Sequence, residues 1–119
     1  MKFNFKRNEK PLTHNNIGDI FNILDNFSIE VMPRTAEKVA DFKSILPKGT
    51  NVYIAHLEGT PIESMIETAA RLHKLQFNVV PHFPARLIKN KLVLDDWIKR
   101  YADLGVNKAL VLAGSPLKA

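Results

Sequence analysis

The sequence predicts an α/β fold, a parallel βαβαβαβ unit that corresponds to half of a (β/α)8 barrel preceded by a short helix. Strand-like apolar runs alternate with amphipathic helical patterns along the chain, which is typical of a parallel sheet. These runs are continuously apolar, as parallel strands covered on both faces are. The chain has 119 residues, about half of the roughly 250 that a complete barrel needs. A small doubly wound sheet is the alternative architecture.

Composition narrows the classes of function. The net charge is +5, but the first ten residues contain four basic side chains and one acidic one, so the rest of the chain is nearly balanced. A nucleic-acid-binding domain usually has a basic stripe through its fold. Neither a signal peptide nor a membrane-spanning run is present, and cysteine is absent. We therefore expect a cytoplasmic protein without nucleic-acid or membrane partners, with a flexible basic tail at residues 1–14 and the partial barrel at 15–119.

The first elements are expected between residues 16 and 49. Helical spacing predicts a short helix from residue 16 to about 26, through Ile17, Ile20, Phe21 and Leu24. Residues 27–32 form a β-prone run that ends at Pro33. Thr35 is then expected to cap a helix whose loose apolar stripe consists of Val39, Phe42, Ile45 and Leu46. Pro47 and Gly49 end that helix.

The same unit recurs twice. Residues 51–55 predict a buried strand, and residues 60–63 predict a capping box with Pro61 at the first helical position. The helix that follows has one apolar face, formed by Ile62, Met65, Ile66 and Ala69. Residues 77–80 predict the third strand. A third helix contains Leu94, Trp97, Ile98 and Tyr101 and ends at Gly105, and residues 108–112 predict the fourth strand.

Glu30 interrupts the first apolar run. Its neighbours Ile29 and Val31 should face the helices, which places Glu30 on the opposite side of the sheet. A carboxyl group in an apolar setting has a raised pKa and can donate a proton near neutral pH. The alternative is a structural carboxylate paired with Arg34 or Arg86.

Two histidines follow strands, His56 after the second and His82 after the third. Together with Glu30 they have the ligand types of a His-His-carboxylate metal set, as in a metal-dependent hydrolase. Their spacing has no local metal signature, however, so no metal site is predicted. The sequence also lacks a G-x-S-x-G elbow, a phosphate loop and a dinucleotide fingerprint.

Four segments, in this order and spacing, resemble the methylenetetrahydrofolate reductase family of flavin enzymes. Residues 28–35, Ser-Ile-Glu-Val-Met-Pro-Arg-Thr, are similar to the family's opening strand, and residues 80–82, Val-Pro-His, to its third strand. Residues 109–115, Ala-Leu-Val-Leu-Ala-Gly-Ser, occupy the place of its fourth-strand Leu-Arg-Gly-Asp. Gly59-Thr-Pro-Ile-Glu63 is similar to the second helix start of divergent members.

The resemblance implies a (β/α)8 barrel that transfers a hydride from NAD(P)H to FAD, and from reduced FAD to methylenetetrahydrofolate. Glu30 falls on the glutamate that protonates the folate and opens its five-membered ring. The resemblance also places five residues against the flavin: His82, Leu112, Ala113, Gly114 and Ser115.

The chain departs from the family pattern in three ways. Where the family has two consecutive prolines, this chain has one, Pro33. Ala113 and Ser115 stand where the family has arginine and aspartate, and loss of that aspartate implies a raised flavin reduction potential. The third departure is length, because the family's second half supplies most contacts to the adenine part of FAD and to folate. We therefore expect either a fragment of a longer protein or a chain that pairs with another half-barrel, as in a homo-oligomer. The alternative function is a non-catalytic interaction module that has lost cofactor binding.

Overall fold

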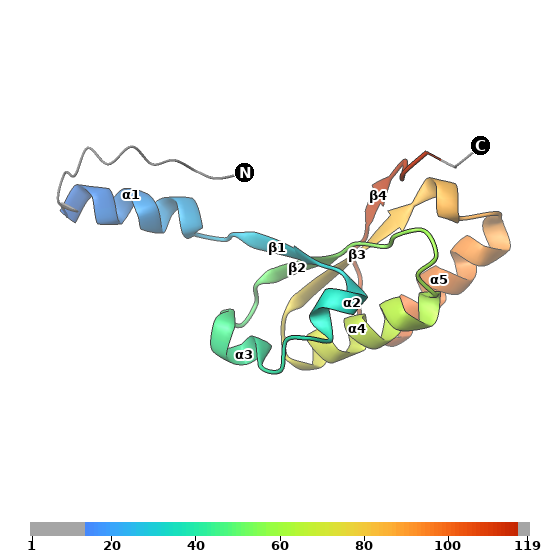
Figure 1. Cartoon of the computed structure of the whole chain (residues 1–119), viewed down its shortest axis with the longest axis horizontal. Helices are drawn as coiled ribbons and strands as arrows, with labels where there is room; N and C mark the ends of the chain where they lie inside the picture. Colours follow the sequence, from blue (N-terminus) through green and yellow to red (C-terminus); the bar gives the residue numbers. More distant parts are fainter. Residues whose placement is uncertain (1–13, 117–119) are drawn as a thin grey trace.

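The strands form one parallel sheet. The computed structural model describes residues 14–116. The sheet contains β1 (Ser28–Val31), β2 (Asn51–Ile54), β3 (Asn78–Pro84) and β4 (Leu110–Leu112) in the order β1-β2-β3-β4 (Figure 1). This confirms the α/β fold. Doubly wound sheets reverse their strand order, and the described strands show no such reversal.

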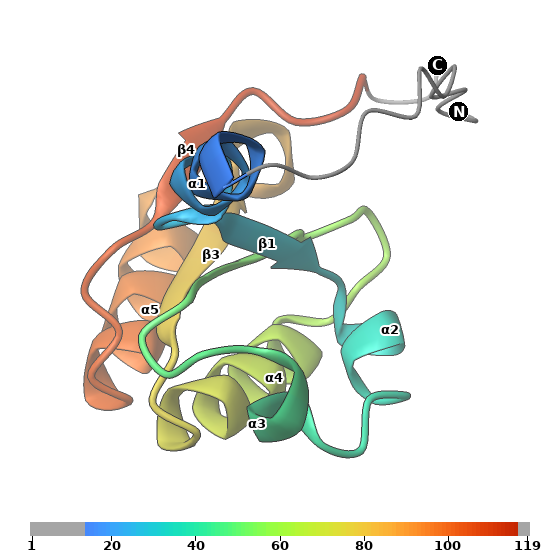
Figure 2. The same ribbon diagram turned by 90° about the vertical axis from the view of Figure 1, so that its left-hand side faces the viewer.

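Helices cover one face of this sheet. The helices are α1 (His14–Leu24), α2 (Pro33–Ala36), α3 (Phe42–Ile45), α4 (Ile62–Lys74) and α5 (Lys91–Asp103), with a 3-10 turn at Ala85–Leu87. Helices α2 to α5 lie on one side of the sheet, whereas α1 extends away from it beyond β1 (Figures 1 and 2). Of the tail expected at residues 1–14, only His14 lies within the described residues, where it begins α1. None of the described helices has the length and apolar character needed to cross a membrane.

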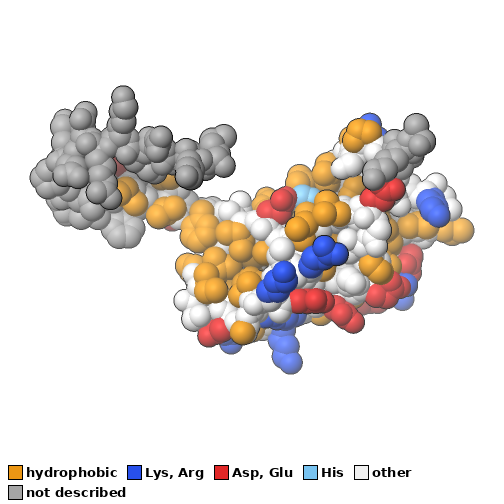
Figure 3. Space-filling view, viewed as in Figure 1, with side chains coloured by type: hydrophobic (Ala, Val, Ile, Leu, Met, Phe, Trp, Pro, Cys, Tyr) orange, Lys and Arg blue, Asp and Glu red, His pale blue; other side chains and the backbone are white. Residues whose placement is uncertain are grey.

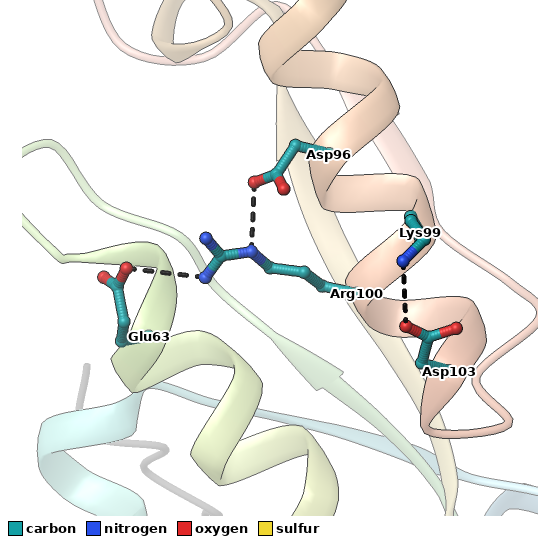
Figure 4. A network of polar contacts seen from close by, with 5 residues as sticks. All are labelled: Glu63, Asp96, Lys99, Arg100 and Asp103. Carbon is teal, nitrogen blue, oxygen red and sulfur yellow. Dashed lines mark hydrogen bonds and ion pairs between the residues drawn. The ribbon is translucent and has the colours of Figure 1, made fainter.

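The core lies between the sheet and helices α4 and α5. The strands contribute Val52, Ile54, Val79 and Phe83, and the two helices contribute Met65, Ala69, Leu72, Trp97 and Tyr101. Arg100 of α5 also links the two helices at their surface. It contacts Asp96 on its own helix at 3.0 Å and Glu63 on α4 at 3.4 Å (Figure 4). Because the three side chains are largely exposed, this link contributes little stability compared with the core.

The single helix expected from Thr35 is wrong, because α2 and α3 are separate. Helix α3 has its own N-cap, since the Asp41 side chain accepts a hydrogen bond from the Ser44 backbone at 3.3 Å. Arg71 of α4 donates to the carbonyl oxygens of Ala36 and Val39. These contacts satisfy carbonyl groups at the end of α2 and just after it, and so stabilise the break between the two helices.

Two other boundaries differ from expectation. The capping box at residues 60–63 is wrong: Pro61 is the N-cap residue of α4 and makes no side-chain cap. Strand β3 continues past Val80 to Pro84, because its partner changes along its length. It pairs with β2 as far as Pro81, and with β4 from His82 onward. His82 therefore lies within a strand and not in the loop that follows it.

Candidate functional site

The strand register defines the residues on the helix-free side of the sheet. Val52 and Ile54 are fully buried in the core, so Tyr53 between them faces the other side. Glu30 is paired with Tyr53, and Tyr53 with Val80. His82 lies two residues beyond Val80 and pairs with Leu110. We call this side the open face; its residues are Glu30, Tyr53, Val80, His82, Leu110 and Leu112.

Glu30 and His82 meet on the open face although a strand separates them. Glu30 Oε1 lies 3.3 Å from His82 Nε2. The ring of Tyr53, on the intervening strand, lies edge-on to the His82 ring with centroids 6.3 Å apart. In Figure 3 a histidine and an acidic side chain lie side by side among exposed hydrophobic atoms along the upper margin of the body. The prediction that Glu30 faces away from the helices is confirmed, and its described ion-pair partner is His82 instead of Arg34 or Arg86.

The expected burial of Glu30 is wrong. Its side chain is 61% exposed, whereas that of His82 is 11% exposed. The difference follows from position, since β1 is an edge strand and β3 lies inside the sheet. The expectation that both faces of the strands are covered is wrong for the same reason: β1 alternates between exposed and half-buried residues, and β4 is mostly exposed.

His56 does not join this pair. It is buried on the helix side, where its ring packs against Trp97 with centroids 4.9 Å apart. Its Nε2 donates to the carbonyl oxygen of Thr60 at 2.9 Å, and Nδ1 has no partner among the described residues. Burial lowers the pKa of His56 more than the Thr60 hydrogen bond raises it. His56 and His82 therefore lie on opposite sides of the sheet, so the expectation that both follow their strands into one site is wrong.

The metal set considered from the sequence does not form in this arrangement. His56 faces the helices, while Glu30 and His82 lie on the open face. Within residues 14–116, no three His, Asp or Glu side chains are grouped so that they could hold a metal ion. A hydrolase that uses Glu30, His56 and His82 as ligands is not consistent with this geometry.

Residues 112–115 run along the end of β3. Leu112 pairs with Pro84, and the Arg86 backbone N–H donates to the Ala113 carbonyl at 3.1 Å. The Arg86 side chain donates to the Gly114 carbonyl. Gly114 has φ +90°, and a Cβ there would lie 3.1 Å from the Pro84 Cβ. Glycine therefore allows this segment to turn beside β3.

Two residues of the open face were not among the site residues expected from the sequence. They are Tyr53 and Leu110, which flank His82 on the neighbouring strands. Alternation along β2 was the available signal, because Val52 and Ile54 are the apolar pair and Tyr53 must oppose them. No such signal existed for Leu110, since β4 reads as continuously apolar.

A comparison with protein-family models found no match to this chain. The fold by itself does not identify a function, because parallel α/β folds support many chemistries. Function must therefore be inferred from the open face and from the segments at residues 28–35, 80–82 and 109–115.

Proposed function

We propose that this chain is one half of a (β/α)8 barrel whose open face becomes the barrel interior. We further propose that the completed barrel is an FAD-dependent oxidoreductase that reduces methylenetetrahydrofolate to methyltetrahydrofolate with NAD(P)H. The observation that carries the proposal is the contact between Glu30 and His82 on the helix-free face. These are two of the residues to which the family resemblance assigns roles.

The arrangement of the sheet supports the barrel part of the proposal. In a (β/α)8 barrel each strand lies beside the next in chain order, and the helices form an outer ring. The described strands follow chain order, and helices α2 to α5 lie on one side. Side chains opposite the helices would then fill the interior, and active-site groups would lie toward the strands' carboxyl ends.

The open face suits a flat aromatic cofactor. Leu110 and Leu112 offer apolar surface, while Tyr53 and His82 offer aromatic surface with polar edges. The turn at Gly114 lies beside Pro84 at the same end. These residues would hold the isoalloxazine part of FAD, which supplies the hydride when bound.

Glu30 would hold the proton for the substrate. Its carboxyl group would give a proton to a ring nitrogen of methylenetetrahydrofolate, so that the C–N bond breaks and the electron pair stays on nitrogen. The methylene carbon, now an iminium, accepts the hydride. His82 Nε2, 3.3 Å from Glu30 Oε1, would orient the carboxyl group. In the single chain Glu30 is exposed to water, which is unfavourable for hydride transfer. The second half-barrel would exclude water from Glu30 and His82.

Titration of the purified chain with FAD tests the proposal, with the flavin absorbance and fluorescence as readouts. Binding should perturb both spectra in the wild-type chain and in Glu30→Gln. Photoreduced flavin on the wild-type chain should be reoxidised by methylenetetrahydrofolate, whereas Glu30→Gln should bind flavin without this reoxidation. Flavin binding with equal reoxidation in both chains would remove Glu30 from the mechanism.

Substitution of Ser115 tests separately whether the flavin lies beside residue 115. A carboxylate beside the flavin disfavours the extra negative charge of its reduced form, so Ser115→Asp should lower the midpoint potential. Ser115→Asn, which is similar in size and uncharged, is the matched control. An unchanged potential in Ser115→Asp would place residue 115 away from the flavin.

A non-catalytic half-barrel that binds another protein is the second candidate. The observation that favours it is that Ala113 and Ser115, which replace charged residues of the family pattern, are both exposed. A chain that is folded by circular dichroism but leaves the flavin spectra unchanged would support this candidate over the reductase.

A further inference from the structure

An apolar groove lies between helix α5 and strand β4. Its volume is about 560 Å³, and its apolar lining includes Phe83, Leu94, Ile98, Tyr101, Val106 and Val111. Val111 is 73% exposed, and Lys108 lies at the rim. Helix α4 packs against β2 and β3, and α5 lies beside α4. The groove is therefore the place where the next helix of this layer would pack.

Helix α1 has an apolar side without a partner among residues 14–116. Ile20, Ile23 and Leu24 are all exposed, and the helix extends away from the sheet (Figure 1). An isolated helix of eleven residues is marginal in water, so its stability depends on packing. Helix α1 also carries the exposed acidic residue Asp19, opposite in charge to Lys108 at the groove.

The two edges of the sheet are complementary. β1 and β4 each have one edge without a strand partner among the described residues, and all strands run in the same direction. If a two-fold axis runs along the strands, β1 of one copy can pair in parallel with β4 of the other, at both junctions. Helix α1 immediately precedes β1, so pairing of β1 with another chain's β4 would bring α1 to that chain's groove.

We infer that a second copy of this chain completes the barrel. Helix α1 of each copy occupies the groove between α5 and β4 of the other, and β1 of each copy pairs with the other's β4. Two four-stranded sheets then form the eight strands of a closed barrel. Asp19 of one copy lies near Lys108 of the other. The inference rests on the half-barrel part of the proposed function and does not depend on flavin.

Association would also change the candidate site. Glu30 lies on β1, the edge strand that would become internal. The partner's sheet would cover the open face, so the carboxyl group that is 61% exposed in one chain would be enclosed. The site is thus incomplete without the second copy.

Sedimentation velocity of the flavin-free chain tests the inference. The wild-type chain should sediment as a dimer. Val111→Asp in the groove and Ile23→Asp on α1 should each raise the dissociation constant by about tenfold or more. Leu92→Asp is the matched control, because Leu92 is as exposed as Ile23, at 79%, but lies outside the groove. Circular dichroism verifies that each variant is folded.

Cross-linking tests where α1 lies. The chain contains no cysteine, so Ile23→Cys and Ile98→Cys chains can be mixed and oxidised. A disulfide-linked heterodimer is expected, whereas Leu92→Cys should not link to Ile23→Cys. A folded wild-type chain that stays monomeric at all concentrations overturns the inference. So does a doubly substituted chain that forms only an internal disulfide, which would place α1 on its own chain. Flavin binding by a monomer would reject the dimer and retain the reductase.

Discussion

The two faces of the sheet differ in how completely they are covered. On the helix side, Val52 and Ile54 of β2 are fully buried beneath α4. On the open face Tyr53 is only half-buried, and Glu30 of the neighbouring strand is largely exposed. Both faces come from the same short strands, whose side chains alternate. The helix side therefore supplies most of the stability of this chain, whereas the open face holds the candidate site.

The largest loss of stability is expected from a substitution on the helix side of the sheet. Met65→Ala should lower the free energy of unfolding by about 2–5 kcal/mol, because Met65 is fully buried and its removal leaves a cavity. Leu92→Ala, at an exposed position, should stay within about 0.5 kcal/mol of wild type. Urea unfolding followed by circular dichroism measures both. Equal losses in the two variants would contradict the assignment of the core to this face.

The second-largest loss of stability is expected at Arg71 of α4, which donates hydrogen bonds to the end of α2. Arg71→Ala should lower the free energy of unfolding by about 1–3 kcal/mol, because the Val39 carbonyl loses its donor. The Ala36 carbonyl loses one of two donors, since it also accepts from the Val39 backbone N–H at 3.1 Å. The guanidinium also lies 5.0 Å from the centre of the Phe42 ring, a contact that the variant loses as well.

Arg71→Lys is the control for this position. Lysine keeps the positive charge but cannot donate in the fixed fork of a guanidinium. Its loss in urea unfolding should fall between those of wild type and Arg71→Ala. A full recovery by lysine would show that charge, and not the paired hydrogen bonds, is what matters.

A smaller change in stability is expected when the pH is lowered. Burial lowers the pKa of His56 from its ordinary value of 6.5, so below about pH 6.5 the unfolded chain binds more protons than the folded chain. The contribution of His56 to stability should be constant above that pH. It should fall by up to about 1.4 kcal/mol for each pH unit below it, until the folded chain is protonated too. Protonation would also put a hydrogen on Nδ1, which has no described partner.

His56→Gln isolates this contribution. Glutamine does not titrate, so the difference in urea midpoint between the two chains should change with pH only below about 6.5. A difference that grows above that pH would show that another group is responsible.

The smallest effect is expected on the open face. Glu30→Gln should change the free energy of unfolding by no more than about 0.5 kcal/mol, because its ion pair with His82 is largely exposed on the glutamate side. Urea unfolding of the flavin-free chain below the concentration of any association measures this value. A loss as large as that of Met65→Ala would make Glu30 a structural residue.

Alternation in the sequence was sufficient to orient Glu30. The apolar neighbours Ile29 and Val31 pack against the core, as expected, and chain order brought His82 close to Glu30. Alternation gives the side on which a residue lies but not what covers that side. The exposure of Glu30 was therefore not predictable, since it depends on what lies beyond the edge of β1.

The errors elsewhere have similar physical causes. Strand parity from Val52 and Ile54 also places His56 on the helix side, so this signal was present in the sequence. The break between α2 and α3 has one local cause, the Asp41 N-cap, and one distant cause, Arg71, more than thirty residues away, of which local patterns contain no sign. The length of β3 depends on its second partner, β4, which is also distant in sequence.

Because β3 changes partner after Pro81, we expect the sheet to open as two units. The first half of β3 pairs with β2, whereas β4 pairs, among the described strands, with the second half of β3 alone. A strand of three residues with little burial can open without disturbing the ladder from β1 to β3. The amide hydrogens that β4 contributes should therefore exchange with solvent through local opening, ahead of those in β2. Pairing of a further strand with β4 would slow that exchange. The exchange rate of the β4 amides therefore reports whether another strand has joined the sheet.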